Sequence, residues 1–325
     1  MPDKIITKLI STIDTSITGF NESIPAIQKQ IFDDITLLIK DLDTTSDGTI
    51  KNNVRNLKII GKIRGKLEEI ILSPEYMKKV EDFVKAFNEV ASLQNQYFRE
   101  IESKFKPSKL LEEISKQSIS WTIDSLTESG IGANVTDEIE DILRRNITSG
   151  GSYKELTNQL RNSIISNKAG QGLLERYVKQ VTVDSIMQYN RTYSQTISDD
   201  LGLSWYLYTG SNILTTREFC LKMTDKKYIH KSELPQIVKG EINGKQIPIN
   251  DKTKTWAGGI PGTNSSNILI NAGGYNCQHQ FQPVLSGVVP KDIRAKFEWL
   301  SIGYNDFKTV KNYQKWCCIY SYTSW

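Results

Sequence analysis

Apolar side chains recur at steps of three and four positions through most of the first 200 residues, and this spacing predicts a series of amphipathic helices. The clearest example follows Ser73-Pro74-Glu75, where the serine can cap, the proline suits a first turn, and the acidic side chain favours the helix start. Lys106-Pro107 predicts the end of this helix. Its apolar stripe comprises Val80, Phe83, Val84, Phe87, Val90, Leu93, Tyr97 and Ile101.

Similar signals divide the rest of this region into helices. Most of these stripes are best interpreted as packing surfaces between helices, with a partner-binding coiled coil as the alternative, because the heptads are not strict. The other expected features are, in order, helix starts at Ser23-Ile24-Pro25 and Ser108, a loop at Ser129–Gly132, a helix from Thr136 to Arg145, a capping box at Ser152–Glu155, and a long helix from Leu173 to Asp200 closed by Gly202.

The pattern of apolar and polar residues changes beyond position 202, where short apolar or aromatic runs alternate with turn residues. Ser204–Tyr208, Asn267–Ile270 and Gln280–Val284 predict strands, and Asn243-Gly244 predicts a hairpin turn between short apolar positions. Lys291–Leu300 predicts a helix. The predicted fold is therefore a mainly α N-terminal region of long helices over residues 1–172, followed by a small α+β domain with an aromatic tail over residues 173–325.

Composition agrees with a change of domain near Gly202. Residues 201–325 hold 15 Lys and Arg against 8 Asp and Glu, whereas the chain as a whole has a net charge of only +4. A diffuse positive charge of this kind is typical of a solvated surface, and phosphate-directed, non-specific contact with DNA is the sharper alternative. The lysines in question are Lys226, Lys227, Lys231, Lys239, Lys245, Lys252 and Lys254.

Several protein classes do not fit the sequence. No apolar run approaches the eighteen or so residues of a membrane span, and Lys8 and Asp14 interrupt the apolar start that a secretory signal would need. Four cysteines, of which Cys317 and Cys318 are adjacent, do not make a secreted disulfide framework, so we expect a reducing, intracellular origin. The usual enzyme motifs HExxH, GxSxG and GxGxxG are also missing.

Candidate chemistry gathers in about sixty residues, which contain Cys220, His230, Cys277 and His279. Two thiolates and two imidazoles can complete a tetrahedral shell around Zn²⁺, although the spacings are not those of standard zinc motifs. A metal-free Cys and His cluster that clamps two loops is the main alternative, and a Cys220–Cys277 disulfide is a third. A Cys–His catalytic pair of Cys277 and His279 is weakly supported, because nothing nearby orients the imidazole. A metal-dependent nuclease built on His230, Asn276 and His279 is weakly supported as well, because 48 residues separate the two histidines.

The order of these features resembles the C-terminal half of the Mu F-like phage head morphogenesis (minor head) proteins. The resemblance covers roughly residues 173–285: a helix containing VDSIMQYNRTYSQTISDDLG, the strand SWYLYTG, the segment TTREFCLKMTDKKYIH, and finally GGYNCQHQFQPV. Thr216, Arg217 and Cys220 fall on the first family motif, and Asn276, Cys277 and His279 on the second. In this chain His279 stands where many members have a second Cys, Gln278 replaces an Arg, and Gly274 replaces a His.

The resemblance implies a low-copy virion protein without enzymatic activity. Such a protein is located inside the head or at the portal, and in the host cytoplasm during assembly. Its partners would be the portal protein and capsid or scaffold proteins, with packaged DNA as a non-specific partner and no membrane. Thr216, Arg217 and Asn276 would then help to hold the small domain together, with or without zinc.

Two other functions remain open. The first is a phage-carried toxin or metal-dependent nuclease, because Mu F-like domains also occur joined to toxin domains. The roughly forty residues from Ser286 to Trp325 are short for an independent catalytic domain, which counts against it. The second is a DNA-binding protein ejected with the genome.

Overall fold

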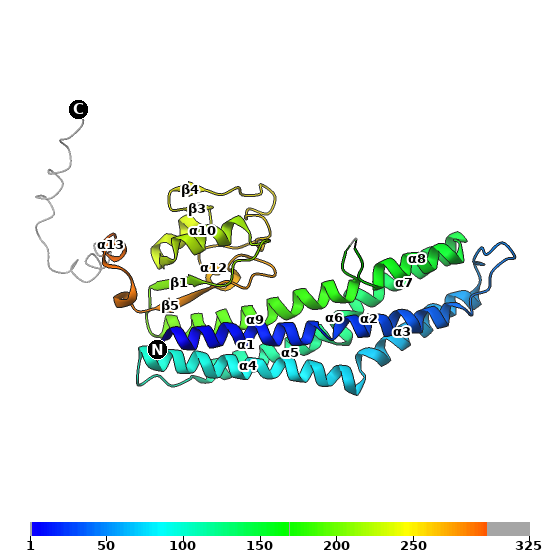
Figure 1. Ribbon diagram of the computed structural model, residues 1–325, viewed down its shortest axis with the longest axis horizontal. Coiled ribbons are helices and arrows are strands. Elements are labelled where there is room, and N and C mark those ends of the chain that lie inside the picture. Colours follow the sequence, from blue (N-terminus) through cyan, green and yellow to red (C-terminus); the bar gives the residue numbers. More distant parts are fainter. Residues whose placement is uncertain (1, 169, 298–325) are drawn as a thin grey trace, which may run out of the picture.

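The computed structural model describes residues 2–168 and 170–297, and it begins with a long helical region (Figure 1). Long helices dominate because the apolar stripes repeat over many turns and bury one face of each helix. The elements of this region are α1 (Pro2–Asn21), α2 (Ile24–Ile39), α3 (Val54–Ile71), α4 (Pro74–Ile101), α5 (Lys109–Leu126), α6 (Glu128–Ile131), the π-helix η1 (Gly132–Thr136), α7 (Asp137–Ser149), α8 (Tyr153–Ile164) and α9 (Leu173–Asp200).

These helices form two four-helix groups placed end to end. One group contains α1, α4, α5 and α9, and the other contains α2, α3, α7 and α8. Four pairs of helices connect one group to the other, each across a short break in the helix. These pairs are α1 and α2, α3 and α4, α5 and α7 (joined by α6 and η1), and α8 and α9. One continuous apolar core runs through both groups. The result is a single elongated helical body (Figure 1).

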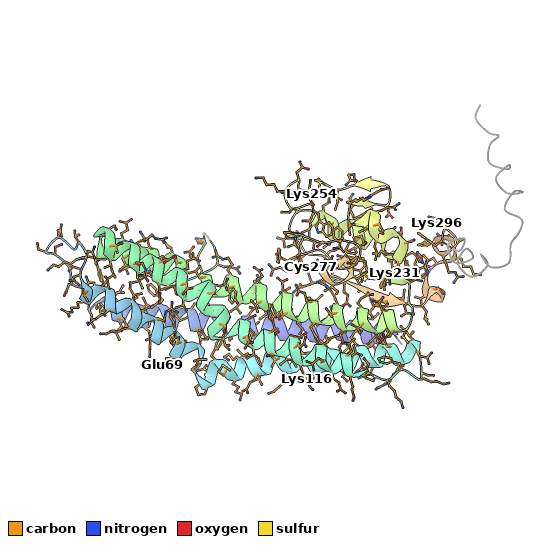
Figure 2. All side chains as sticks on the ribbon, turned by 180° about the vertical axis from the view of Figure 1, so that it is seen from behind. Glu69, Lys116, Lys231, Lys254, Cys277 and Lys296 are labelled. Carbon is orange, nitrogen blue, oxygen red and sulfur yellow. The ribbon has the colours of Figure 1, made fainter. Side chains whose placement is uncertain are left out.

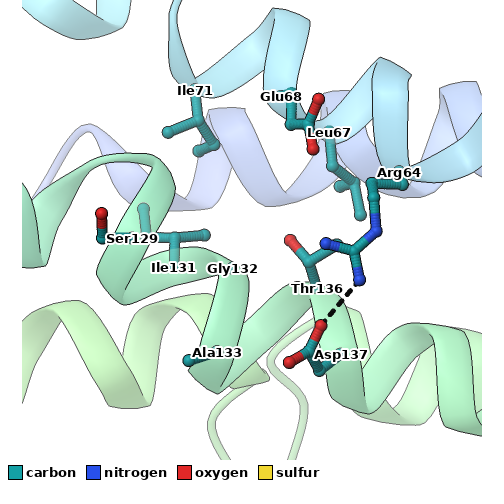
Figure 3. A pocket seen from close by; sticks show the side chains of 10 residues that line it. All are labelled: Arg64, Leu67, Glu68, Ile71, Ser129, Ile131, Gly132, Ala133, Thr136 and Asp137. Carbon is teal, nitrogen blue, oxygen red and sulfur yellow. Dashed lines mark hydrogen bonds and ion pairs between the residues drawn. The ribbon is translucent and has the colours of Figure 1, made fainter.

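The junction between the two groups is held by polar contacts to the C-terminal end of α5. The Tyr76 hydroxyl donates to the carbonyl oxygen of Leu126 at 2.7 Å, and the Tyr177 hydroxyl donates to that of Ser125 at 2.9 Å. These bonds satisfy carbonyls that a helix end leaves without partners. A pocket of about 280 Å³ lies beside this junction, and α3 and residues 129–137 form its walls. At its edge Arg64 Nη2 donates to Asp137 Oδ1 at 2.8 Å (Figure 3).

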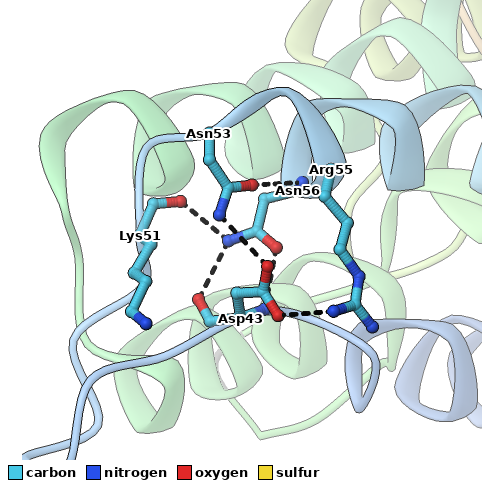
Figure 4. A network of polar contacts seen from close by, with 5 residues as sticks. All are labelled: Asp43, Lys51, Asn53, Arg55 and Asn56. Atoms are coloured by element: carbon cyan, nitrogen blue, oxygen red, sulfur yellow. Dashed lines mark hydrogen bonds and ion pairs between the residues drawn. The ribbon is translucent and has the colours of Figure 1, made fainter.

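The connection between α2 and α3 is folded around one buried amide. Asn56 donates through Nδ2 to the carbonyl oxygens of Asp43 at 2.9 Å and of Lys51 at 2.7 Å, and its Oδ1 accepts from the Asp43 amide at 2.8 Å (Figure 4). The Asp43 carboxylate also accepts from Arg55 at 2.9 Å. Asn56 therefore fixes the long connection between α2 and α3, at the end of the helical body away from the small α+β unit.

Most of the predicted helices are confirmed, with three local corrections. The predicted starts at Ser23, Ser73 and Ser108 agree with the structure, and α9 ends close to Gly202. Helix α4, however, ends at Ile101, before the predicted stop at Lys106-Pro107. The loop expected at Ser129–Gly132 is instead α6 and the start of η1. Ser152 precedes α8 but makes no side-chain capping bond, so the capping box is absent.

A small α+β unit follows α9 and lies over one end of the helical body (Figure 1). Its sheet has the antiparallel order β2-β1-β5, and a separate hairpin joins β3 to β4. The elements are β1 (Trp205–Thr209), α10 (Glu218–Lys226), β2 (Tyr228–His230), the 3-10 turn η2 (Lys231–Glu233), α11 (Leu234–Ile237), β3 (Glu241–Ile242), β4 (Lys245–Gln246), α12 (Ile268–Asn271), β5 (Gln280–Val284), the 3-10 turn η3 (Ser286–Val288) and α13 (Lys291–Arg294).

The predictions for this region are confirmed in part. The hairpin turn at Asn243-Gly244 and the strands β1 and β5 form as expected, and Pro283 is accommodated because β5 is at the sheet edge. The strand expected at Asn267–Ile270 is instead the helix α12. The helix expected at Lys291–Leu300 forms only over α13, since residues 295–297 are a turn. Residues 298–300 lie outside the described residues, as do Cys317, Cys318 and the aromatic tail.

The sheet meets the helical body through a buried polar seam, which we define as Gln94, Asn190, Gln280 and Gln282. The Gln94 amide donates to Asn190 at 2.7 Å, Asn190 donates to Gln280, and Gln280 donates to Gln282 at 3.3 Å. The side chains of α9 also belong to the helical core, so α9 is shared by the two parts. None of the described helices combines the length and apolar character needed to cross a membrane.

Candidate metal centre

Three of the predicted ligands come together in the small domain. Cys220 lies on α10, whereas Cys277 and His279 lie on the segment that leads into β5. The two sulfur atoms are 3.7 Å apart, and Cys277 Sγ is 4.0 Å from His279 Nδ1. All three side chains are buried, with exposed fractions of 2%, 3% and 5%, and their ligand atoms lie within 4.8 Å of one another. This cluster can hold a metal ion.

The spacing of the sulfur atoms matches a tetrahedral metal better than a disulfide. Zinc–sulfur bonds of about 2.3 Å at tetrahedral angles place two sulfur ligands about 3.8 Å apart. The observed 3.7 Å is close to this value, and the 4.0 Å separation from Nδ1 needs only a small contraction. A disulfide would require the sulfur atoms to approach to about 2.0 Å. Both cysteines are free in the structure.

The surroundings of His279 direct Nδ1 toward the sulfur atoms. Nε2 lies 3.0 Å from Oδ1 of Asn212, an acceptor, so Nε2 carries the proton and Nδ1 keeps its lone pair for a metal. The ring also stacks on Tyr208, with centroids 5.5 Å apart and planes inclined by 12°. A protein partner that fixes the ring and tautomer in this way is characteristic of metal-binding histidines.

A tight turn brings the backbone close to both cysteines. The Cys277 amide donates to the carbonyl oxygen of Gly274 at 3.3 Å, and Asn276 has a positive φ of 55°. Gly273 packs against the sulfur pair, since a Cβ at this position would overlap Cys220 Sγ and lie 2.7 Å from Cys277 Sγ. The glycine therefore provides the close approach that lets the turn carry Cys277 to α10.

Helix α9 anchors this turn from below. Arg191 is 4% exposed and donates from Nε to the carbonyl oxygen of His279 at 3.0 Å and from Nη1 to that of Ile270 at 3.1 Å. Its Nη2 donates to the carbonyl oxygen of Cys277. Asp184, two turns earlier on the same face of α9, accepts from the Asn276 amide at 2.6 Å. One helix of the body thus fixes the backbone of both ligands on this segment.

The hydrogen bond between the two thiols shifts their pKa values in opposite directions. The hydrogen bond between them and burial raise the pKa of Cys220, which keeps its proton, while the same bond lowers the pKa of Cys277 well below the usual value of a thiol. The Tyr208 hydroxyl, whose own pKa is raised by burial, donates a hydrogen bond to Cys220 Sγ at 3.4 Å. Metal binding requires both sulfur atoms as thiolates and would therefore release the protons that the pair still holds.

The cluster opens on one side to a pocket of about 230 Å³. Its described lining consists of Ser211, Ile213, Thr215, Thr216, Arg217, Cys220, Asn276, Cys277, Gln278 and His279. The predicted motif residues Thr216, Arg217 and Asn276 are thus all beside the cluster. Thr216 Oγ1 accepts from the Ile213 amide at 2.7 Å, and Arg217 donates to the carbonyl oxygen of Tyr275. Figure 2 places Cys277 inside the small domain.

His230, the fourth predicted ligand, does not join the cluster. It pairs with Trp205 at the opposite end of β1 from Tyr208, and its ring contacts Trp205 and Phe297 with centroids 4.9 and 5.0 Å apart. Its Nδ1 instead accepts from the Ser232 amide at 3.3 Å and so caps η2. The predicted four-ligand set is therefore reduced to three, because strand pairing carries His230 away.

The sequence analysis did not single out the residues that position the candidate ligands, several of which are far from them in the sequence. Asn212, Tyr208, Asp184 and Arg191 belong to no metal-binding motif. Tyr208, Asn212 and Arg191 contact residues of the cluster, and Asp184 contacts the amide of the neighbouring Asn276. Asp184 and Arg191 are two of many polar residues on α9, so no signal in the sequence singled them out. Two of the seven basic residues considered for DNA are paired instead, Lys226 with Glu233 at 2.7 Å and Lys231 with Asp199 at 3.0 Å.

Comparisons with known proteins give no relative of this chain. No family model, no curated protein and no solved structure matches it.

Proposed function

We propose that this chain is a minor head protein of a tailed phage, a low-copy structural component that binds the portal or the capsid interior during assembly. One observation supports the proposal above others. The residues that carry the Mu F-like resemblance come from two segments more than fifty positions apart, yet Arg217, Cys220, Asn276, Cys277 and His279 line one pocket. Motif residues from two distant segments that meet in space are expected if the two segments belong to one folded domain.

The helical body suits a role in protein contacts. Helices α4 and α9 each have 28 residues, which corresponds to about 42 Å of helix. Two four-helix groups in line therefore offer a long lateral surface, with the small domain at one end only. A portal or capsid protein could contact this surface without disturbing the cluster.

Zinc is the metal that we propose for the cluster. Two cysteine sulfurs and one imidazole nitrogen are typical zinc ligands, and their spacing is close to that of a tetrahedral shell. The metal would join α10 to the segment before β5 and would hold the small domain together. Its chemistry in this role is structural.

Quantitative mass spectrometry of purified particles tests the assembly role. Particles would come from the phage or prophage that carries this coding sequence, and filled heads would be compared with emptied ones. A few copies retained in emptied heads would support a portal-linked component. Loss with the genome would favour the ejected DNA-binding protein, and absence from both would favour the toxin alternative.

A second experiment addresses the toxin or nuclease alternative directly. Expression of the wild-type chain and of His279→Ala in a bacterial host would be compared for growth and for nucleic-acid integrity. A structural cluster predicts that neither chain inhibits growth. Inhibition by the wild type that disappears in His279→Ala would replace the minor head proposal with a hydrolytic one.

A further inference from the structure

We infer that the metal centre keeps one coordination position open to the pocket, and that this position binds a small carboxylate together with Arg217. The inference rests on the proposed zinc site and extends it from a closed structural site to a ligand-binding one. It begins from the number of ligands. Among the residues that the structure describes, only Cys220, Cys277 and His279 gather as potential metal ligands here, whereas zinc prefers four.

The other sides of the cluster are closed by packed protein atoms. Gly273 lies directly against both sulfur atoms, and the Tyr208 ring covers the face of His279. The turn is fixed from the helical body by Arg191. All three ligands nevertheless line the same pocket of about 230 Å³. A fourth ligand would therefore enter from the pocket.

The chemistry of the pocket wall favours an anionic oxygen ligand. Arg217 contributes a guanidinium group with five N–H donors, of which one is used on the carbonyl oxygen of Tyr275. Thr216 and Ser211 add hydroxyl groups, while no Asp or Glu belongs to the described lining. Arg217 is therefore the one side chain with a permanent positive charge among these lining residues.

The charge of the metal centre does not oppose such a ligand. Zinc with two thiolates and a neutral imidazole has no net charge, so the metal centre would not repel a carboxylate. Arg217 would attract one, although the Asp184 carboxyl outside the pocket lining already interacts with its positive charge. A carboxylate fits both partners, because one oxygen can bind zinc while the other accepts from the guanidinium. The pocket volume limits the ligand to a small acid or to the side chain of an acidic residue on a partner.

Cobalt substitution of the full-length chain tests the inference, because Co²⁺ reports its coordination through visible absorption. X-ray absorption should give two sulfur, one nitrogen and one oxygen ligand. Addition of acetate should change the visible spectrum in a saturable manner, whereas the neutral isostere acetamide should not. Arg217→Gln should weaken acetate at least tenfold, and Lys245→Gln, a matched charge loss on the exposed β3–β4 hairpin, should not.

The outcomes separate this inference from the zinc proposal. Failure of the wild-type chain to bind cobalt would remove the metal site, and the open position with it. Cobalt binding with a third sulfur ligand, or with no response to acetate, would overturn the open position while the metal site stands. The comparison of acetate with acetamide uses only the wild-type chain, so it decides the matter even if Arg217→Gln does not fold.

Discussion

The guanidinium group of Arg191 donates to the carbonyl oxygen of His279 from both Nε, at 3.0 Å, and Nη2, at 2.6 Å. One buried side chain on α9 therefore sets the backbone of a candidate metal ligand that lies 88 positions later in the sequence. Since the same group also bonds the carbonyl oxygens of Ile270 and Cys277, it connects the helical body to the candidate metal centre.

Replacement of Arg191 should destabilise the chain. Arg191→Met leaves three buried carbonyl oxygens without their donor, and we expect a loss of about 3 kcal/mol in the free energy of unfolding. Urea unfolding followed by circular dichroism measures this loss. Lys179→Met, on an exposed face of the same helix, is the control and should change the free energy by less than about 0.5 kcal/mol. Equal effects of the two variants would contradict the anchoring role.

Gly273→Ala should damage the metal centre. An added Cβ overlaps Cys220 Sγ and lies 2.7 Å from Cys277 Sγ, so the sulfur atoms must separate. We expect zinc affinity to fall at least tenfold, as measured by competition with a chromophoric chelator. Gly287→Ala is the matched control, because nothing lies within 4 Å of its Cβ position. Retention of full affinity in Gly273→Ala would argue against the cluster as the zinc site.

Zinc content should follow the three clustered residues and not His230. The purified wild-type chain should retain one zinc ion after dialysis, whereas Cys220→Ala and Cys277→Ala should lose it and His279→Ala should bind it more weakly. His230→Ala should keep the metal, because its side chain lies at the other end of β1. Elemental analysis of the purified variants gives the answer, and loss of zinc in His230→Ala would contradict the three-ligand site.

His230 should make stability depend on pH near neutrality. Burial lowers the pKa of His230, so the folded chain favours the neutral ring that accepts from the Ser232 amide. The stability that this preference provides is present above the unfolded value of about 6.5 and is lost as the pH falls through the lowered folded pKa. Melting temperatures at pH 7.5 and pH 5 measure the loss. His230→Asn keeps a capping acceptor without titrating and should show a smaller loss.

Asp184 should have the opposite relation to pH. Burial raises the pKa of this carboxyl above 3.8, so its contribution to stability is present below the unfolded pKa and is lost as the pH rises through the folded one. Asp184→Asn can still accept from the Asn276 amide and carries no buried charge. We therefore expect the stability of Asp184→Asn relative to wild type to increase between pH 4 and pH 7. A constant difference in urea unfolding over this range would refute the assignment.

The helical elements could be predicted because their signals are local. Repeated apolar positions with Ser and Pro at the boundaries define α2, α4 and α5 without reference to the rest of the chain. The loop expected around Gly130 is wrong for a tertiary reason. Gly130 packs beneath the Tyr177 hydroxyl, where a Cβ would collide, so the glycine serves close packing inside a helical segment. The short apolar run that forms α12 has no periodicity to separate helix from strand.

The candidate site was predictable only as a set of residue types. Cys220, Cys277 and His279 were recognisable as potential ligands, but the exclusion of His230 depends on which end of β1 each strand meets. The roles of Arg191 and Asn212 depend on contacts across 88 and 67 positions, which no local pattern encodes.

The polar seam beneath the sheet has a consequence for how β5 aligns with its neighbours. Gln280 faces Asn190, while Phe281 faces Tyr208 in the apolar core of the small domain. A slip of one residue would exchange these faces, placing an aromatic ring against an amide and a glutamine among apolar side chains. The seam therefore favours one alignment of the strand, and that alignment brings Cys277 and His279 together to Cys220 on α10.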